Sequence, residues 1–272
     1  MIVKREGGQT AAYGEFAALY DALMHGVDYD GWASWLVERL RAGGVDPRPT
    51  GGGKPPLVLD CACGTGALTV RLSRLGYDVV GSDLSEDMLR AAQQKAMAAG
   101  LRIPFVRQDM RHVCAHRPAD AVTACCDGVN YLTSADDVCA FFRAAYAALR
   151  PGGLLLFDVS SAYKLSAVLG GNTFGEDTPD CTYLWRNAFD PATRLLEMRL
   201  AFFTPDGGGR YRRFDETHLQ RAHTAAEISA WLTACGFVGQ ACYAAFTADA
   251  PKEDTERIQW TAYKPQTQTA TR

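Results

Sequence analysis

The apolar positions between residues 57 and 159 predict strands and helices in alternation. Short continuous apolar runs are expected to form buried strands at residues 57–60, 77–83, 103–108, 119–126 and 154–159. Helical spacing of apolar residues predicts helices at 67–75 and 135–149, and Ser85 is a natural N-cap for another. Because strands that alternate with helices form parallel sheets, this part of the chain predicts a doubly wound α/β fold.

A different pattern follows the fifth predicted strand. Strand-like segments, the second with apolar residues at every other position, are expected at residues 181–189, 194–204 and 210–222. Asp190-Pro191 and the glycine-rich run 206–209 supply turns between them. This pattern predicts an antiparallel sheet inserted into the parallel architecture. The remaining elements expected are a helix at 225–235 and a terminal hairpin of strands at 237–246 and 258–263.

The chain before the first strand predicts two helices. Aromatic and apolar residues have helical spacing at residues 13–24 and again at 32–40, and the glycine-rich and proline-rich run 51–56 is the expected linker. Two interpretations stay open for the aromatic stripe. It either packs onto the core or forms a lid over a site.

Composition narrows the class of protein. With 272 residues and 47% hydrophobic content, the chain can bury one large core, and no run approaches the length of a membrane span. Residues 1–8 lack the apolar core of a signal peptide, so we expect a soluble, cytosolic protein. The net charge of -3 offers no basic field for nucleic acid, and Arg210, Arg212 and Arg213 are interpreted as a solvated cluster. Nine cysteines without C-x-x-C pairs predict reduced thiols and no metal site.

The turn after the first strand carries the main candidate chemistry. Asp60 ends the strand and is followed by Gly64-Thr65-Gly66, while the position where a dinucleotide fingerprint needs its third glycine is Thr69. A carboxylate at this place would repel a pyrophosphate but attract the ammonium and sulfonium of S-adenosylmethionine. The charge therefore favours S-adenosylmethionine over NAD, although the Gly-x-Gly alone also fits an ordinary turn, and a nicotinamide dehydrogenase stays open on fold alone.

Acidic residues end the next two predicted strands. Asp83 lies 17 positions beyond Gly66, close to the spacing at which a βαβ unit places a carboxylate on a ribose. Asp109 follows the third strand, where it either accepts from an adenine amino group or caps the next helix. The fourth strand ends at the topological switch point, where substrate is expected to meet cofactor beside Asp127, Asn130 and Tyr131.

These segments together resemble the class I S-adenosylmethionine-dependent methyltransferases. The resemblance rests on the glycine loop at 59–66, the acid in 81–85, the adenine segment 108–110 and the turn 149–154. It implies a mostly parallel seven-stranded sheet, S-adenosylmethionine as methyl donor and S-adenosylhomocysteine as product. The residues expected to bind the cofactor in this part of the chain are Asp60, Cys61, Gly64, Gly66, Asp83, Leu84, Met88, Asp109, Met110 and Cys126. Asp60 would serve the methionine end and Asp83 the ribose.

The N-terminal aromatic segment is similar to the lid of small-molecule N-methyltransferases, including those that act on amino sugars and amino acids. By this resemblance Tyr13 and Tyr20 would close over the methyl donor. The domains are then a helical lid at 1–50, a Rossmann-like cofactor domain at 51–160 and 223–272, and an antiparallel substrate-cover lobe at 161–222.

Glu216 and His218 are expected on one side of a strand in the inserted sheet, since side chains repeat every second residue. They are candidates to bind or deprotonate an acceptor, with Tyr20 as a third candidate, although an exposed polar pair is an equal interpretation. His218 also fits a short Glu-x-His match to aminosugar enzymes.

The function predicted is methyl transfer by in-line displacement to a small molecule, with an amine favoured over a hydroxyl. Nucleobase-amino enzymes of this family carry Asn/Asp-Pro-Pro-aromatic after the fourth strand, whereas this chain has Asp127-Gly128-Val129-Asn130-Tyr131. Two alternatives stay open: a tRNA or protein methyltransferase, and a non-catalytic protein that binds S-adenosylmethionine as a regulator. A homodimer is left open as well.

Overall fold

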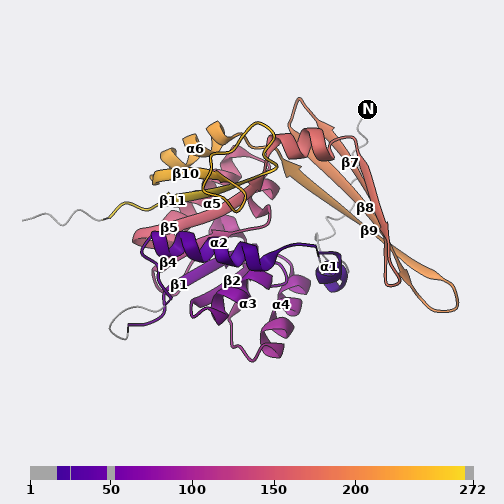
Figure 1. Ribbon diagram of the computed structural model, residues 1–272, viewed down its shortest axis with the longest axis horizontal. Coiled ribbons are helices and arrows are strands. Elements are labelled where there is room, and N and C mark those ends of the chain that lie inside the picture. Colours follow the sequence, from indigo (N-terminus) through magenta and orange to yellow (C-terminus); the bar gives the residue numbers. More distant parts are fainter. Residues whose placement is uncertain (1–16, 25, 48–52, 267–272) are drawn as a thin grey trace, which may run out of the picture.

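The computed structural model describes residues 17–24, 26–47 and 53–266 and contains two sheets (Figure 1). The larger, sheet A, has the strand order β10-β11-β5-β4-β1-β2-β3. Its strands are β1 (Leu57–Cys61), β2 (Asp78–Asp83), β3 (Phe105–Arg107), β4 (Ala119–Ala124), β5 (Leu149–Ser160), β10 (Val238–Ala244) and β11 (Arg257–Tyr263). Strands β1 to β5 are parallel, and β11 lies antiparallel between β5 and β10. The predicted seven-stranded, mostly parallel sheet is confirmed.

Helices cover both faces of sheet A. Helices α2 (Tyr29–Ala42) and α3 (Ala67–Arg74) pack on one face, where Trp35 and Leu36 join a cluster with Val58 of β1. Helices α5 (Ala135–Ala148) and α6 (Ala225–Ala234) pack on the other face, α5 through Phe141 and Phe142. Continuous burial on both faces explains the uninterrupted apolar strands of the sequence.

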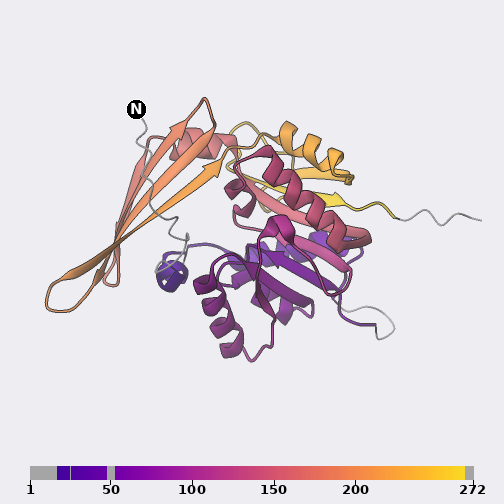
Figure 2. The same cartoon turned by 180° about the vertical axis from the view of Figure 1, so that it is seen from behind.

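Sheet B is inserted between β5 and α6. It is antiparallel with the order β6-β7-β8-β9, formed by β6 (Thr173–Asp177), β7 (Thr182–Asp190), β8 (Leu195–Pro205) and β9 (Tyr211–Arg221). The predicted inserted sheet is confirmed, and its long strands reach well beyond sheet A (Figures 1 and 2). The π-helix η3 (Lys164–Leu169) and strand β6 were absent from the sequence-based prediction, because β6 is short and mostly exposed.

Two small apolar clusters join sheet B to the rest of the molecule. Helix α1 (Ala17–Leu23) contributes to a cluster with Met88 of α4 (Glu86–Ala98) and Phe202 of β8. Helix η3 packs through Leu165 and Leu169 against β8. These contacts hold the inner face of sheet B over the carboxyl ends of the parallel strands. None of the described helices is long and apolar enough to cross a membrane.

Candidate active site

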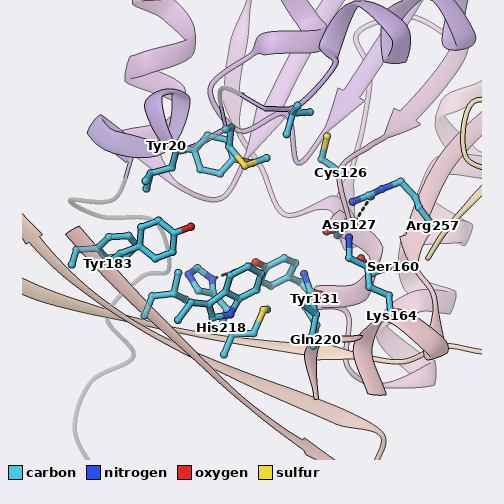
Figure 3. Close-up of a pocket in the computed structure, with 18 of the residues that line it drawn as sticks. Tyr20, Cys126, Asp127, Tyr131, Ser160, Lys164, Tyr183, His218, Gln220 and Arg257 are labelled. Atoms are coloured by element: carbon cyan, nitrogen blue, oxygen red, sulfur yellow. Dashed lines mark hydrogen bonds and ion pairs between the residues drawn. The ribbon is translucent and has the colours of Figure 1, made fainter. Parts of the chain in front are cut away.

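A cavity of about 250 Å³ lies between the carboxyl ends of β4 and β5 and the inner face of sheet B (Figure 3). Helix α1 contributes Tyr20 to its wall, and β7 contributes Tyr183 and Trp185. Its polar lining includes His218 and Gln220 of β9. Open α/β sheets bind ligands at this end of their strands, so the fold places a partly open, mainly apolar cavity where a substrate is expected.

The glycine loop and the acid at the tip of β2 lie together. Gly64 and Gly66 have φ angles of +54° and +73°, which L side chains rarely adopt. The Asp83 carboxylate accepts hydrogen bonds of 2.9 Å from the backbone N–H groups of Gly64 and Ser85. A Cβ added at Gly64 would meet no atom within 4 Å, so a ligand has room to approach the backbone. This arrangement fits a nucleoside whose ribose pairs with Asp83, and that contact stays a prediction.

Asp60 lies just below this loop and is 3% exposed. Its carboxylate accepts hydrogen bonds from the hydroxyls of Thr69, at 2.5 Å, and Thr123, at 2.8 Å. Burial raises the pKa of Asp60 to about 6, although these two hydrogen bonds lower it. Thr69, which the sequence marks only as the missing third glycine, is therefore a partner of this carboxylate. Neither Asp60 nor its buried neighbour Cys61 lines the cavity.

The residues predicted around the adenine have varied surroundings. Asp109 accepts the N–H of Arg111 and forms an ion pair of 2.6 Å with its guanidinium, which lowers the pKa of Asp109. Met110 is buried in the main core, while Leu84 is 58% exposed. Met88 packs against α1 and sheet B. Their contacts with a cofactor stay predictions. Tyr13 lies outside the described residues.

The turn after β4 is fixed by a buried ion-pair network. Cys126 and Asp127 both have positive φ, and their N–H groups donate to Asp158 of β5 at 2.7 and 3.2 Å. Arg257 of β11 pairs with both Asp127 and Asp158. Burial raises the pKa of Asp158, and the charge of Arg257 offsets part of this increase. Burial also acts to raise the pKa of Asp127, but the charges of Arg257 and Lys164 outweigh it, so the pKa of Asp127 is lowered. Asp158 and Arg257 were not identified as site residues from the sequence. The only sequence signal for this pair is that Asp158 is a carboxylate inside an apolar strand.

Two other residues predicted at this turn have distinct surroundings. Tyr131 lines the cavity, with its hydroxyl 3.3 Å from Nδ1 of His218. Asn130 is fully buried, where its amide donates to the carbonyls of Ser160 and Arg221 and accepts from the N–H of Ser160. Its side chain thus joins β5 to the end of β9. The predicted acceptor contact of Asn130 stays a prediction.

The three candidate catalytic side chains come from α1 and β9. His218 is 4% exposed, and burial lowers its pKa to about 4, so its imidazole is neutral at physiological pH. Burial also raises the pKa of Tyr20 well above its usual range, so its hydroxyl keeps its proton. Glu216 shares the inward side of β9 with His218 but does not line the cavity. The structure therefore brings His218 and Tyr20 to one cavity.

The strand order of sheet A, with its antiparallel β11, and the glycine loop beside Asp83 define a class I methyltransferase. The family model described as a methyltransferase domain matches residues 58–153. A putative methyltransferase of Bacillus subtilis (strain 168), YqeM, is 37% identical over 256 residues, which are 94% of this chain and 98% of that protein.

The solved structures agree. A crystal structure of an S-adenosylmethionine-dependent methyltransferase from Clostridium acetobutylicum is 32% identical, with a TM-score of 0.80 over 93% of this chain and 99% of that chain. The sugar N-methyltransferase KedS8 from Streptoalloteichus is 22% identical and shares the fold, with a TM-score of 0.75 over 98% and 99% of the two chains. This chain belongs to the class I S-adenosylmethionine-dependent methyltransferases, and S-adenosylmethionine is its cofactor.

Proposed function

We propose that this methyltransferase acts on a small-molecule acceptor and transfers the methyl group to an amine nitrogen. The observation that carries the proposal is the cavity between sheets A and B, whose wall contains a neutral, buried histidine. A space of about 250 Å³ suits a small acceptor better than a folded macromolecule. The methyltransferases of amino sugars that share this fold are consistent with this class of acceptor.

The pKa of His218 favours nitrogen over oxygen. A hydroxyl acceptor needs a base to remove its proton, and a histidine with a pKa of about 4 is a weak base at neutral pH. An amine that binds as its free base, having lost its ammonium proton to solvent, already has the lone pair that attacks, so within the site it needs only orientation. When Nδ1 of His218 donates to the Tyr131 oxygen, Nε2 is the acceptor nitrogen and can orient an N–H group of the substrate.

The other residues of the cavity orient the acceptor and limit its contact with water. The bound cofactor supplies a methyl group already activated on a sulfonium. Tyr20 and the aromatic residues of β7 form part of the cavity wall and leave less room for water beside the acceptor. The same wall orients the acceptor in line with the methyl group. In this proposal His218 is a catalytic residue through its contact with the acceptor. Roles for Glu216 and the Tyr20 hydroxyl in the reaction stay predictions.

The test is S-adenosylhomocysteine formation over a panel of small amines and matched alcohols, with bulk tRNA and protein included. We expect turnover of amines, and a His218→Ala loss in kcat of about tenfold to a hundredfold with unchanged S-adenosylhomocysteine affinity. The control is His116→Ala, which changes an exposed histidine remote from the cavity lining. Turnover of alcohols, tRNA or protein in place of amines would contradict the proposal.

A further inference from the structure

The cavity has one charged end. Asp127, Ser160, Lys164 and Arg257 lie together there, away from Tyr20 and Tyr183 on the other side (Figure 3). The four residues come from the turn after β4, the end of β5, the start of η3 and the start of β11. Charged groups at the wall of a mainly apolar cavity restrict which ligand can fill it, because filling removes their water.

Three of these four side chains already have partners. Arg257 pairs with Asp127 and with the fully buried Asp158. The Ser160 side chain stabilises the Asp127 carboxylate and so helps to lower its pKa. The guanidinium of Arg257 also lies over the ring of Trp32, 5.3 Å from its centroid. These groups satisfy one another before any ligand binds.

Lys164 is the exception among the cavity's charged side chains. It is partly buried, and its Nζ has no hydrogen bond or ion pair with any residue that the structure describes. It is near enough to lower the pKa of Asp127, but it does not pair with that carboxylate. Leu165 and Leu169 anchor its helix in the cluster under sheet B, and the Ser161 hydroxyl accepts the Lys164 N–H at 3.0 Å. These contacts fix the backbone of Lys164 at the cavity wall, while its ammonium makes no hydrogen bond or ion pair with the described residues.

We propose that Lys164 determines specificity by pairing with an anionic group of the acceptor, a carboxylate or a phosphate. This inference rests on the proposed function and deepens it: the acceptor is a small amine that also carries an anion. An acceptor that fills the cavity displaces water from the Lys164 ammonium, and an anionic group restores the lost interaction more fully than a neutral oxygen does, because the charge-assisted hydrogen bond is the stronger one. A neutral acceptor would offer that partly buried ammonium only an uncharged and weaker hydrogen-bond partner, and a purely cationic one would offer none.

The experiment compares matched probes that differ in one anionic group: glucosamine 6-phosphate with glucosamine, and glycine with glycinamide. Each is titrated calorimetrically into the enzyme saturated with S-adenosylhomocysteine and then tested for turnover with S-adenosylmethionine. Lys164→Met keeps most of the side-chain volume and removes the charge. The matched control is Lys252→Met, which changes an exposed lysine in the loop before β11.

We expect wild-type enzyme to bind at least one anionic probe tenfold or more tighter than its neutral partner. Lys164→Met should abolish that preference, raise KM for the anionic acceptor about tenfold, and leave kcat and S-adenosylhomocysteine affinity unchanged. Equal affinities within both pairs, or a preference that survives Lys164→Met, would overturn the inference. Because the titrations need no methyl transfer, they decide it even if no amine is turned over, which would contradict the proposed function instead.

Discussion

The buried carboxylate of Asp60 lies below the glycine loop, so its substitution tests both the stability of the fold and the predicted cofactor contact. Replacing it in Asp60→Asn removes the charge and keeps the shape. Its two partners are hydroxyls, and the Thr123 hydroxyl also lies 3.5 Å from the carbonyl of Leu59. That hydroxyl can turn to the Leu59 carbonyl and accept from the new amide, while Thr69 continues to donate. The substituted side chain therefore fits the existing hydrogen-bond network.

The expected magnitude follows from the pKa. Raising a carboxyl pKa from 3.8 to about 6 means that ionised Asp60 destabilises the folded state at pH 8 by about 3 kcal/mol, since one pKa unit is about 1.4 kcal/mol. The folded state holds this proton more tightly than the unfolded state, so the penalty disappears as the pH falls. At pH 5 about half of it remains. Asp60→Asn removes this destabilisation of the folded state, but rearranged hydrogen bonds should cost about 1 kcal/mol of the gain.

The assay is urea unfolding of the cofactor-free enzyme at pH 8 and pH 5. Asp60→Asn should be more stable than wild type by about 2 kcal/mol at pH 8, with a clearly smaller difference at pH 5. The exposed Asp254→Asn is the control and should show little change at either pH. Calorimetry should show weaker S-adenosylmethionine binding if Asp60 attracts its cationic end. Destabilisation by Asp60→Asn at pH 8, or a difference independent of pH, would refute this reasoning.

Two further substitutions test how the site is held. Asn130→Ala removes the partner of two buried backbone groups of Ser160 and of the partly buried Arg221 carbonyl, and should cost about 3 kcal/mol in the urea-derived free energy of unfolding. Asp21→Asn removes the charge that pairs α1 with Lys95 and weakens the hydrogen bond from the Thr65 hydroxyl. Calorimetry should show S-adenosylhomocysteine affinity falling by up to about fivefold, as expected for a half-exposed pair.

Each of these substitutions has a contrary outcome. A stability change below about 1 kcal/mol for Asn130→Ala would show that the amide contributes little to joining β5 and β9. Asp78→Asn removes the charge of a similarly exposed pair, between Asp78 and Arg117, and should leave the cofactor affinity unchanged because Asp78 begins β2, at the opposite edge of sheet A from the glycine loop. An equal loss of affinity in both variants would show that Asp21 has no particular role beside the cofactor loop.

The sequence predicted the parallel core well because each strand there is buried on both faces and reads as a short apolar run. The spacing of Asp83 from the glycine loop was equally informative, since one βαβ unit fixes the distance between adjacent strand tips. The boundaries were less accurate. The predicted strand at 154–159 begins at Leu149 in the structure, where Gly152, with a φ of +71°, lets the chain pass through the Pro-Gly-Gly turn within β5.

The charged end of the cavity was not predictable in the same way. Arg257 and Asp158 are 99 residues apart, and their pairing depends on the antiparallel placement of β11 beside β5. Lys164 belongs to a π-helix that the spacing of apolar residues did not predict. Its position at the cavity wall therefore follows only from the packing of this helix under sheet B. Long-range pairing and local irregularity both lie outside what apolar patterns record.

The central claim is that the crevice between the two sheets holds the methyl donor next to a small amine. The most direct measurement incubates the enzyme with methyl-deuterated S-adenosylmethionine and a mixture of small amines, amino acids, alcohols, tRNA and protein, and locates the label by mass spectrometry. The account predicts the labelled methyl group on the nitrogen of a small acceptor, with the signal greatly reduced in His218→Ala. Label on oxygen, on tRNA or on protein, with none on a small amine, would contradict it.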